Sequence, residues 1–140
     1  MKKIITLSII AILFAFNADA QRFGITAGKD NTGRVLTYNY LTPAYSATIT
    51  ITPAIAGKYK TVIKPATLTG NAEIDITDTY SVVCDELTFI FTSDGTGRVV
   101  TFDNNFIVYG TLTLVASKKG TVTFVYDGTN YVETARTIQQ

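Results

Sequence analysis

The feature that most constrains the fold of this chain is a regular alternation of apolar side chains with threonine. Four stretches carry it: SATITIT (46–52), ELTFIFT (86–92), GTLTLVA (110–116) and GTVTFVY (120–126). Successive side chains of a β-strand point to opposite faces, so this period is typical of strands with one buried face. Threonine is β-branched and tolerates water, which suits the exposed face. No stretch beyond residue 20 has the period of an amphipathic helix, so the sequence predicts an all-β fold.

Glycine, aspartate and asparagine separate these stretches at intervals of roughly ten residues. The strongest hairpin signal is Asp127-Gly128, which lies between two arms of alternating pattern. The spacing predicts roughly eight to ten short antiparallel strands, arranged as a β-sandwich or a jelly roll. Two segments, NTGRVLTY (31–38) and GTGRVVTF (95–102), resemble each other. We interpret them as similar turn-and-strand segments rather than as units of a repeat array.

Residues 1–20 have the layout of a secretory signal peptide. Lys2-Lys3 precedes an apolar run over 4–16, and Ala18-Asp19-Ala20 forms a small-x-small cleavage site. The run is shorter than the roughly 20 residues that a membrane-spanning helix needs. We therefore predict cleavage between Ala20 and Gln21, secretion of the product, and a single β-sandwich domain over residues 21–140.

The predicted domain is electrically neutral and contains no histidine. Removal of Lys2, Lys3 and Asp19 with the signal peptide leaves ten basic and ten acidic residues. A neutral chain lacks long-range attraction to nucleic acid, so no nucleic-acid partner is expected. The lack of histidine excludes Ser-His-Asp catalysis and histidine-bound zinc. Cys84 is the one cysteine, and we predict that it is a buried small apolar residue, with a reactive thiol or an intermolecular bridge as the alternatives.

Carboxylates are the remaining candidates for chemistry. Asp75 alternates with Ile74 and Ile76, which predicts an outward strand position, whereas the domain's other aspartates lie at turns or strand ends. A glycosidase needs two carboxylates across one sugar bond. Calcium needs several oxygen ligands, which a loop with Asp94 or residues 103–105 could offer. We favour turn chemistry over both, and expect a protein that is not an enzyme and has no cofactor.

The candidate binding surface is a group of tyrosines in the first half of the domain: Tyr38, Tyr40, Tyr45 and Tyr59. Aromatic rings can stack on sugar rings, so this group indicates a glycan-binding face. The competing interpretation is packing in the core or in an interface, with the hydroxyl groups kept in water. Separately, Arg34 and Arg98 each follow a Thr-Gly turn, where we expect them to bond turn carbonyls or to pair with a nearby aspartate.

Residues 67–136 carry a further pattern. TLTGNAEIDI, DELTFIFTSDGTGRVVTF and GTLTLVASKKGTVTFVYDGTNYVETAR follow one another there. They resemble a β-rich module of tailed-phage structural proteins, found at the ends of fibre, spike or appendage proteins and in small virion proteins. The module's turns read Gly-Asp-Glu-Leu, Asp-x-Thr-Gly-Arg and Tyr-Asp-Gly-Thr-x-Trp-x-Glu. This chain has Cys84 in place of that glycine and Tyr131 in place of that tryptophan.

The resemblance implies a non-enzymatic structural protein of a virion or virion-like surface. It implies assembly with copies of itself, commonly three in fibres, and contact with other virion or surface proteins. The location is then either secreted, after cleavage, or virion-associated, with the apolar N-terminus taking part in assembly. The alternative function is a secreted β-sandwich that binds carbohydrate or another surface through the four tyrosines. A third hypothesis is a glycosidase that uses two carboxylates.

Overall fold

The computed structural model describes residues 27–29, 35–52, 58–77 and 81–140, and all regular structure in these ranges is β-strand. The strands are β1 (Ala27–Lys29), β2 (Val35–Leu41), β3 (Thr48–Ile51), β4 (Lys58–Ile63), β5 (Ala72–Ile76), β6 (Glu86–Thr92), β7 (Arg98–Phe102), β8 (Phe106–Ile107), β9 (Leu112–Leu114), β10 (Lys119–Tyr126) and β11 (Tyr131–Ile138). No described segment is a helix long and apolar enough to cross a membrane. The all-β prediction is confirmed, and the predicted signal peptide lies outside the described residues.

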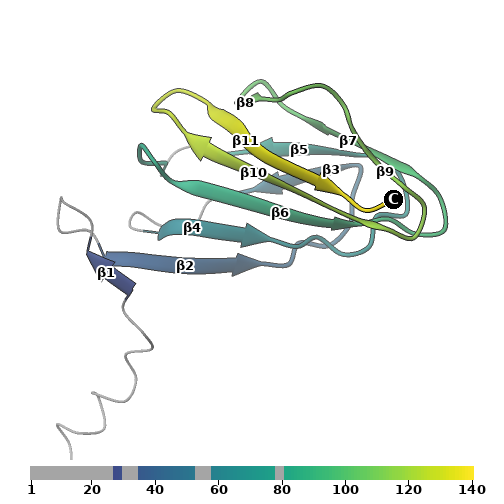
Figure 1. The fold of residues 1–140 in the computed structure, drawn as a ribbon, viewed down its shortest axis with the longest axis horizontal. Coiled ribbons are helices and arrows are strands. Elements are labelled where there is room, and N and C mark those ends of the chain that lie inside the picture. Colours follow the sequence, from purple (N-terminus) through teal and green to yellow (C-terminus); the bar gives the residue numbers. More distant parts are fainter. Residues whose placement is uncertain (1–26, 30–34, 53–57, 78–80) are drawn as a thin grey trace, which may run out of the picture.

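The strands form two sheets that lie one over the other (Figure 1). The seven-stranded sheet has the order β1-β2-β4-β6-β10-β11-β8, and the four-stranded sheet has the order β3-β5-β7-β9. From β2 to β7 the chain passes alternately between the sheets. Strands of successive passes are parallel neighbours: β2 with β4, β4 with β6, β3 with β5, and β5 with β7. The fold is therefore a β-solenoid of about 3 turns, and the prediction of an antiparallel sandwich or jelly roll was wrong.

Each turn of the solenoid advances the chain by more than twenty residues. In the seven-stranded sheet, Tyr38 pairs with Lys60 and Lys60 pairs with Glu86, which are steps of 22 and 26 residues. In the four-stranded sheet, the step from Thr48 to Glu73 is 25 residues. The similar segments at 31–38 and 95–102 do not mark these steps, because their strand residues lie in β2 and β7, which belong to different sheets.

The last part of the chain closes one end of the solenoid with antiparallel pairs. β10 pairs antiparallel with β6, and β11 pairs antiparallel with β10. β9 pairs antiparallel with β7, while the short β8 runs parallel to β11. The predicted hairpin at Asp127-Gly128 is confirmed as the β10–β11 connection. Its loop has four residues, since Tyr126 pairs with Tyr131, and is therefore longer than the expected two-residue turn.

The wrong fold prediction has a physical reason. Strands of a solenoid and strands of a sandwich both bury one face, so both show the same two-residue period. The alternation correctly identified the inward side chains, such as Ile49, Phe89 and Leu112, which are all buried. It could not identify the partner strand. Sequential strands commonly pair with each other, which favoured an antiparallel arrangement, but here the partner lies one full turn away.

The core lies between the sheets and is rich in phenylalanine near the closed end. Phe89 on β6 and Phe124 on β10 are fully buried, and their ring centroids are 6.0 Å apart. Phe106 on β8 packs on Phe124 at 4.8 Å, and Phe102 at the end of β7 lies 5.0 Å from the same ring. Burying one such side chain contributes about 1.5–3 kcal/mol, so this cluster is what joins the last turn of the solenoid to its closing hairpin.

Candidate functional site

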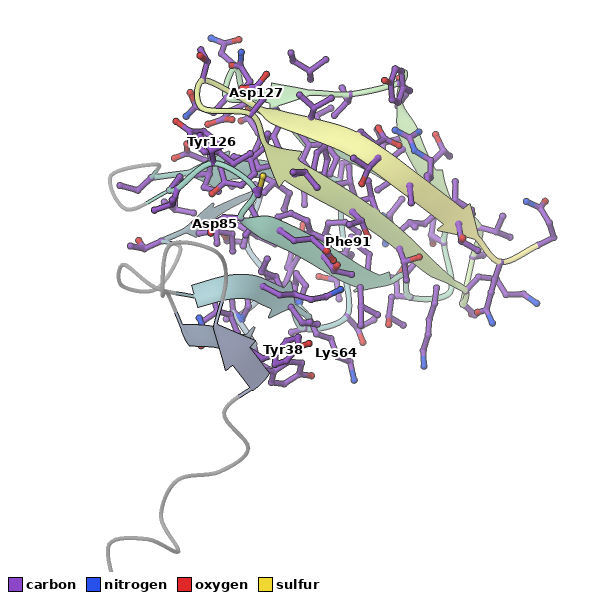
Figure 2. All side chains as sticks on the ribbon, turned by 60° about the vertical axis from the view of Figure 1, so that its left-hand side comes forward. Tyr38, Lys64, Asp85, Phe91, Tyr126 and Asp127 are labelled. Atoms are coloured by element: carbon purple, nitrogen blue, oxygen red, sulfur yellow. The ribbon has the colours of Figure 1, made fainter. Side chains whose placement is uncertain are left out.

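Two of the four predicted surface tyrosines lie together on the outer side of the seven-stranded sheet. Tyr38 and Tyr40 are two residues apart on β2 and are 64% and 57% exposed. Across the ladder Tyr38 pairs with Lys60, and Tyr40 pairs with Val62. In Figure 2, Tyr38 lies at the edge of the sheet, far from the turn that carries Tyr126 and Asp127. Two of the four candidate tyrosines therefore form an exposed aromatic pair.

The other two predicted tyrosines do not extend this pair. Tyr45, in the β2–β3 connection, packs against the core, and its hydroxyl donates to the Asn71 carbonyl oxygen at 3.3 Å. That hydroxyl also lies over Gly70, where a larger residue would force the Tyr45 side chain to move. Tyr45 is therefore a packing residue. The side chain of Tyr59 lies outside the described part of the chain.

The acidic turn residues hold their own turns. The carboxylate of Asp94 accepts from Arg98 Nε at 2.9 Å and Nη2 at 2.6 Å, and from the Thr96 N–H at 3.0 Å. The hydrogen bonds from Arg98 hold the pKa of Asp94 below its ordinary value, against an opposing effect of burial. The predicted pairing of Arg98 with an aspartate is confirmed, whereas Arg34 lies outside the described residues.

The β10–β11 loop is organised in the same way. The Asp127 carboxylate accepts from the backbone N–H groups of Asn130 and Thr129, both at 2.8 Å. These hydrogen bonds, that of Asn130 first, lower the pKa of Asp127. Gly128 has a φ of +110°, which a residue with a side chain rarely adopts. Tyr131 follows the loop, is fully buried, and places its hydroxyl 2.6 Å from that of Ser81.

Cys84 departs from its predicted environment. It is exposed rather than buried, and it has a left-handed backbone with φ of +73°. Its position is the reason: it lies in a tight turn outside the sheet, where the Asp85 N–H donates to the Val82 carbonyl at 2.8 Å. Residues 81–85 belong to no strand, and β6 begins only at Glu86.

Two carboxyl groups lie together on the outer side of the four-stranded sheet. Asp75 is on β5 and Asp103 directly follows β7, next to the pair formed by Ile74 and Phe102. Burial, a hydrogen bond with Asp75 and its negative charge together raise the pKa of Asp103. Asp75 also accepts from Thr50 Oγ1 at 3.4 Å. The outward position predicted for Asp75 is confirmed, while its contact with Asp103 depends on parallel stacking of turns and was not predicted.

The loop at 103–105, for which we favoured turn chemistry over calcium binding, is a turn in the structure. Asp103 accepts from the Asn105 N–H at 3.0 Å and from the Ile76 N–H at 3.3 Å. Within the described ranges, no three side chains of histidine, cysteine, aspartate or glutamate come together as a metal site would require.

Sequence reasoning missed a buried ion pair in the closing hairpin. Glu133 is 3% exposed and forms a bidentate pair with Arg136, at 2.7 Å for both contacts. Glu133 also accepts from the Tyr109 N–H at 2.9 Å, and Arg136 donates to the carbonyls of Thr111 and Gly110. Burial alone would raise the pKa of Glu133, but Arg136 and the Tyr109 N–H outweigh it and lower that pKa. The sequence did contain a signal for the burial of Glu133, because period two places it on the same inward face of β11 as Tyr131, two residues earlier.

The ion pair fixes a loop that borders an open pocket of about 260 Å³. Its lining is Val100, Thr101, Phe102, Val108, Gly110 and Thr111. This lining offers two hydroxyl groups and no charged side chain, so the pocket suits a small uncharged group at most. Tyr109 is 71% exposed but does not line the pocket.

Comparison with protein-family models and with curated protein sequences finds no match for this chain.

Proposed function

We propose that this chain is a non-enzymatic structural protein of a virion or virion-like surface assembly. The observation that carries the proposal is the role of the residues behind the phage-module resemblance. Residues 67–136 span β5 to β10 and most of β11, which are the last turn of the solenoid and its closing strands. Asp94 and Asp127 hold turns there, and Tyr131 fills the core. Residues that form turns and fill the core determine the shape of a protein. The resemblance therefore concerns shape, and a structural surface protein depends on its shape.

The test is to express the chain with its own N-terminus and to recover it from particles, cells and medium. Intact mass reports whether the chain begins at Met1 or at Gln21, and light scattering reports the number of copies. We expect a multi-copy assembly that associates with particles or with the cell surface. A strictly monomeric chain without affinity for any particle or surface component would contradict the proposal.

A second function, glycan binding, is favoured by the adjacent exposed rings of Tyr38 and Tyr40. Such a pair could stack on successive sugar rings, with Lys60 beside them as a hydrogen-bond donor. A glycan array with the double variant Tyr38→Ala/Tyr40→Ala tests it. The matched control is Tyr109→Ala, since Tyr109 is equally exposed but lies elsewhere. A blank array for the unmodified chain would remove this candidate.

A further inference from the structure

The outer side of the seven-stranded sheet is poor in charge. We call it the outer face, and it comprises the outward residues of five neighbouring strands: Tyr38, Tyr40, Lys60, Val62, Glu86, Thr88, Ile90, Thr92, Lys119, Thr121, Thr123, Val125, Val132, Ala135 and Thr137. Three members are charged: Lys60 and Glu86 form an ion pair with each other, and Lys119 lies at the end of β10. Every other member is aliphatic, threonine or tyrosine. No described element crosses this face (Figure 1).

The opposite side of the molecule, which is the outer side of the four-stranded sheet, is acidic. The outward positions of the four-stranded sheet include Glu73 and Asp75, next to Asp103, and no described ion pair neutralises them. Like charges on two copies of that surface would repel each other. The outer face of the seven-stranded sheet has no such cluster of like charges, and charge depletion is what distinguishes the centre of a protein interface.

The polar groups at the centre of the outer face already have partners within the chain. The hydroxyl groups of Thr88 and Thr123 lie 3.3 Å apart, and Thr88 Oγ1 donates to Glu86 Oε1 at 3.1 Å. Covering these hydroxyls would therefore leave none of them without a hydrogen bond. Around them lie Ile90 and Val125, whose β-branched side chains pack well on a pleated surface.

The size of the outer face fits a weak, reversible contact. Five strands spaced by about 4.8 Å, with seven or eight residues at about 3.3 Å each in the longest, span roughly 19 Å by 25 Å, or about 500 Å². Two such faces would together bury about 1,000 Å², which is the size of a weak interface rather than of a permanent one. We propose that this face packs against the same face of a second copy of the chain, as an isologous sheet-on-sheet contact. The inference rests on the proposed function, for which it supplies the unit of assembly.

The test places a lysine on the face and measures self-association by sedimentation velocity over a wide range of concentration. Thr121→Lys lies at the centre of β10, and Ala135→Lys lies on β11, where an exposed position should tolerate lysine. The matched control is Thr113→Lys, an outward threonine on β9 of the other sheet. Circular dichroism verifies the fold of each variant. We expect the unmodified chain to dimerise and both face variants to weaken the dimer more than about tenfold, with Thr113→Lys unchanged.

Several results would overturn the inference. One is an unmodified chain that remains monomeric at the highest concentration; if it still associates with particles, the proposed function survives without this contact. Another is a dimer that Ala135→Lys leaves intact although this variant is folded. A third is a dimer that Thr113→Lys weakens as much as the face variants do. Should Thr121→Lys fail to fold, Ala135→Lys decides alone. Dimerisation of the unmodified chain that is lost in the face variants only would support the inference.

Discussion

At the scale of single residues, the turn before β6 holds a cysteine in a backbone conformation that favours glycine. Cys84 has a left-handed φ of +73° in a turn closed by two hydrogen bonds between Val82 and Asp85, both at 2.8 Å. That conformation costs a residue with a Cβ roughly 1–2 kcal/mol, whereas glycine adopts it freely. Cys84 is therefore a strained residue of this turn.

We accordingly predict that Cys84→Gly stabilises the protein. The gain in the free energy of unfolding should be about 1 kcal/mol, because relief of strain exceeds the added entropy of the unfolded chain. Urea unfolding under reducing conditions measures it. The control is Cys84→Ala, which removes the sulfur but keeps the Cβ and should give no gain. If Cys84→Ala stabilises as much as Cys84→Gly, the backbone explanation is wrong.

At the scale of elements, ion pairs of similar appearance differ in their surroundings. Glu133 on β11 is 3% exposed and anchors the β8–β9 connection through Arg136 and the Tyr109 N–H. Lys60 on β4 and Glu86 on β6 pair across neighbouring strands instead, and their side chains are 31% and 21% exposed. Water screens the second pair and competes with it, so the buried pair should matter more to stability.

Arg136→Met should therefore destabilise the protein by about 3 kcal/mol, because it leaves a buried carboxylate without its cation. The control Lys60→Met should cost less than about 1 kcal/mol. In the unmodified chain the lowered pKa of Glu133 gives stability that is lost as the pH falls through that pKa. In Arg136→Met burial dominates and raises this pKa, so the deficit should shrink in acid. Urea unfolding of Arg136→Met and Lys60→Met at neutral and acidic pH measures these changes in the free energy of unfolding. Equal losses of stability for the two variants would contradict the prediction.

The stacked strands β5 and β7 create a second pH-dependent contact. Burial and Asp75 raise the pKa of Asp103 above its ordinary value of 3.8, so the folded state binds this proton more tightly than the unfolded chain. The resulting stability is complete below the ordinary value and is lost as the pH rises through the raised pKa. Two adjacent carboxylates thus oppose the fold at neutral pH.

Asp75→Asn should relieve this repulsion. We expect a gain of about 0.5 kcal/mol at neutral pH, in the range for like-charged neighbours across strands, and no gain in strong acid. The control is Glu73→Gln, an outward carboxylate of the same strand that pairs with Thr48 and Thr101. Thermal unfolding across the pH range measures the difference. A gain from Asp75→Asn that persists in acid, or that Glu73→Gln reproduces, would refute a charge effect between Asp75 and Asp103.

At the scale of the whole molecule, a solenoid is stabilised by contacts between neighbouring turns. β6 has a hydrogen-bonded neighbour on each side, β4 and β10, and packs on the phenylalanine cluster. β3 lies at the edge of its sheet and has one neighbour, β5. The closed end should therefore be more stable against local opening than the first turn.

Amide hydrogen exchange should show this gradient. We predict that the amides of β6 and β10 exchange only through global unfolding, while those of β2 and β3 exchange faster through local opening. Phe124→Ala should lower the free energy of unfolding by about 3–5 kcal/mol and accelerate exchange in every strand. Ile49→Val, in the first turn, should cost about 1 kcal/mol and affect mainly β2 and β3. Uniform protection along the chain would contradict the gradient.

The sequence by itself determined the features that depend on local chemistry. Period two identified strands and their inward side chains, and Asp127-Gly128 identified the closing hairpin, because side-chain alternation and turn conformation are properties of adjacent residues. It also singled out Tyr38 and Tyr40, whose exposure follows from their shared face of β2.

Only the tertiary structure decided which strands are neighbours, and therefore everything that depends on neighbours. A parallel partner 22 or 26 residues away leaves no mark on the alternation of either strand. The solenoid, the contact of Asp75 with Asp103 and the anchoring of Tyr109 by Glu133 all arise from such pairings. The outer face arises in the same way, since it is assembled from the outward residues of strands that lie far apart in the chain.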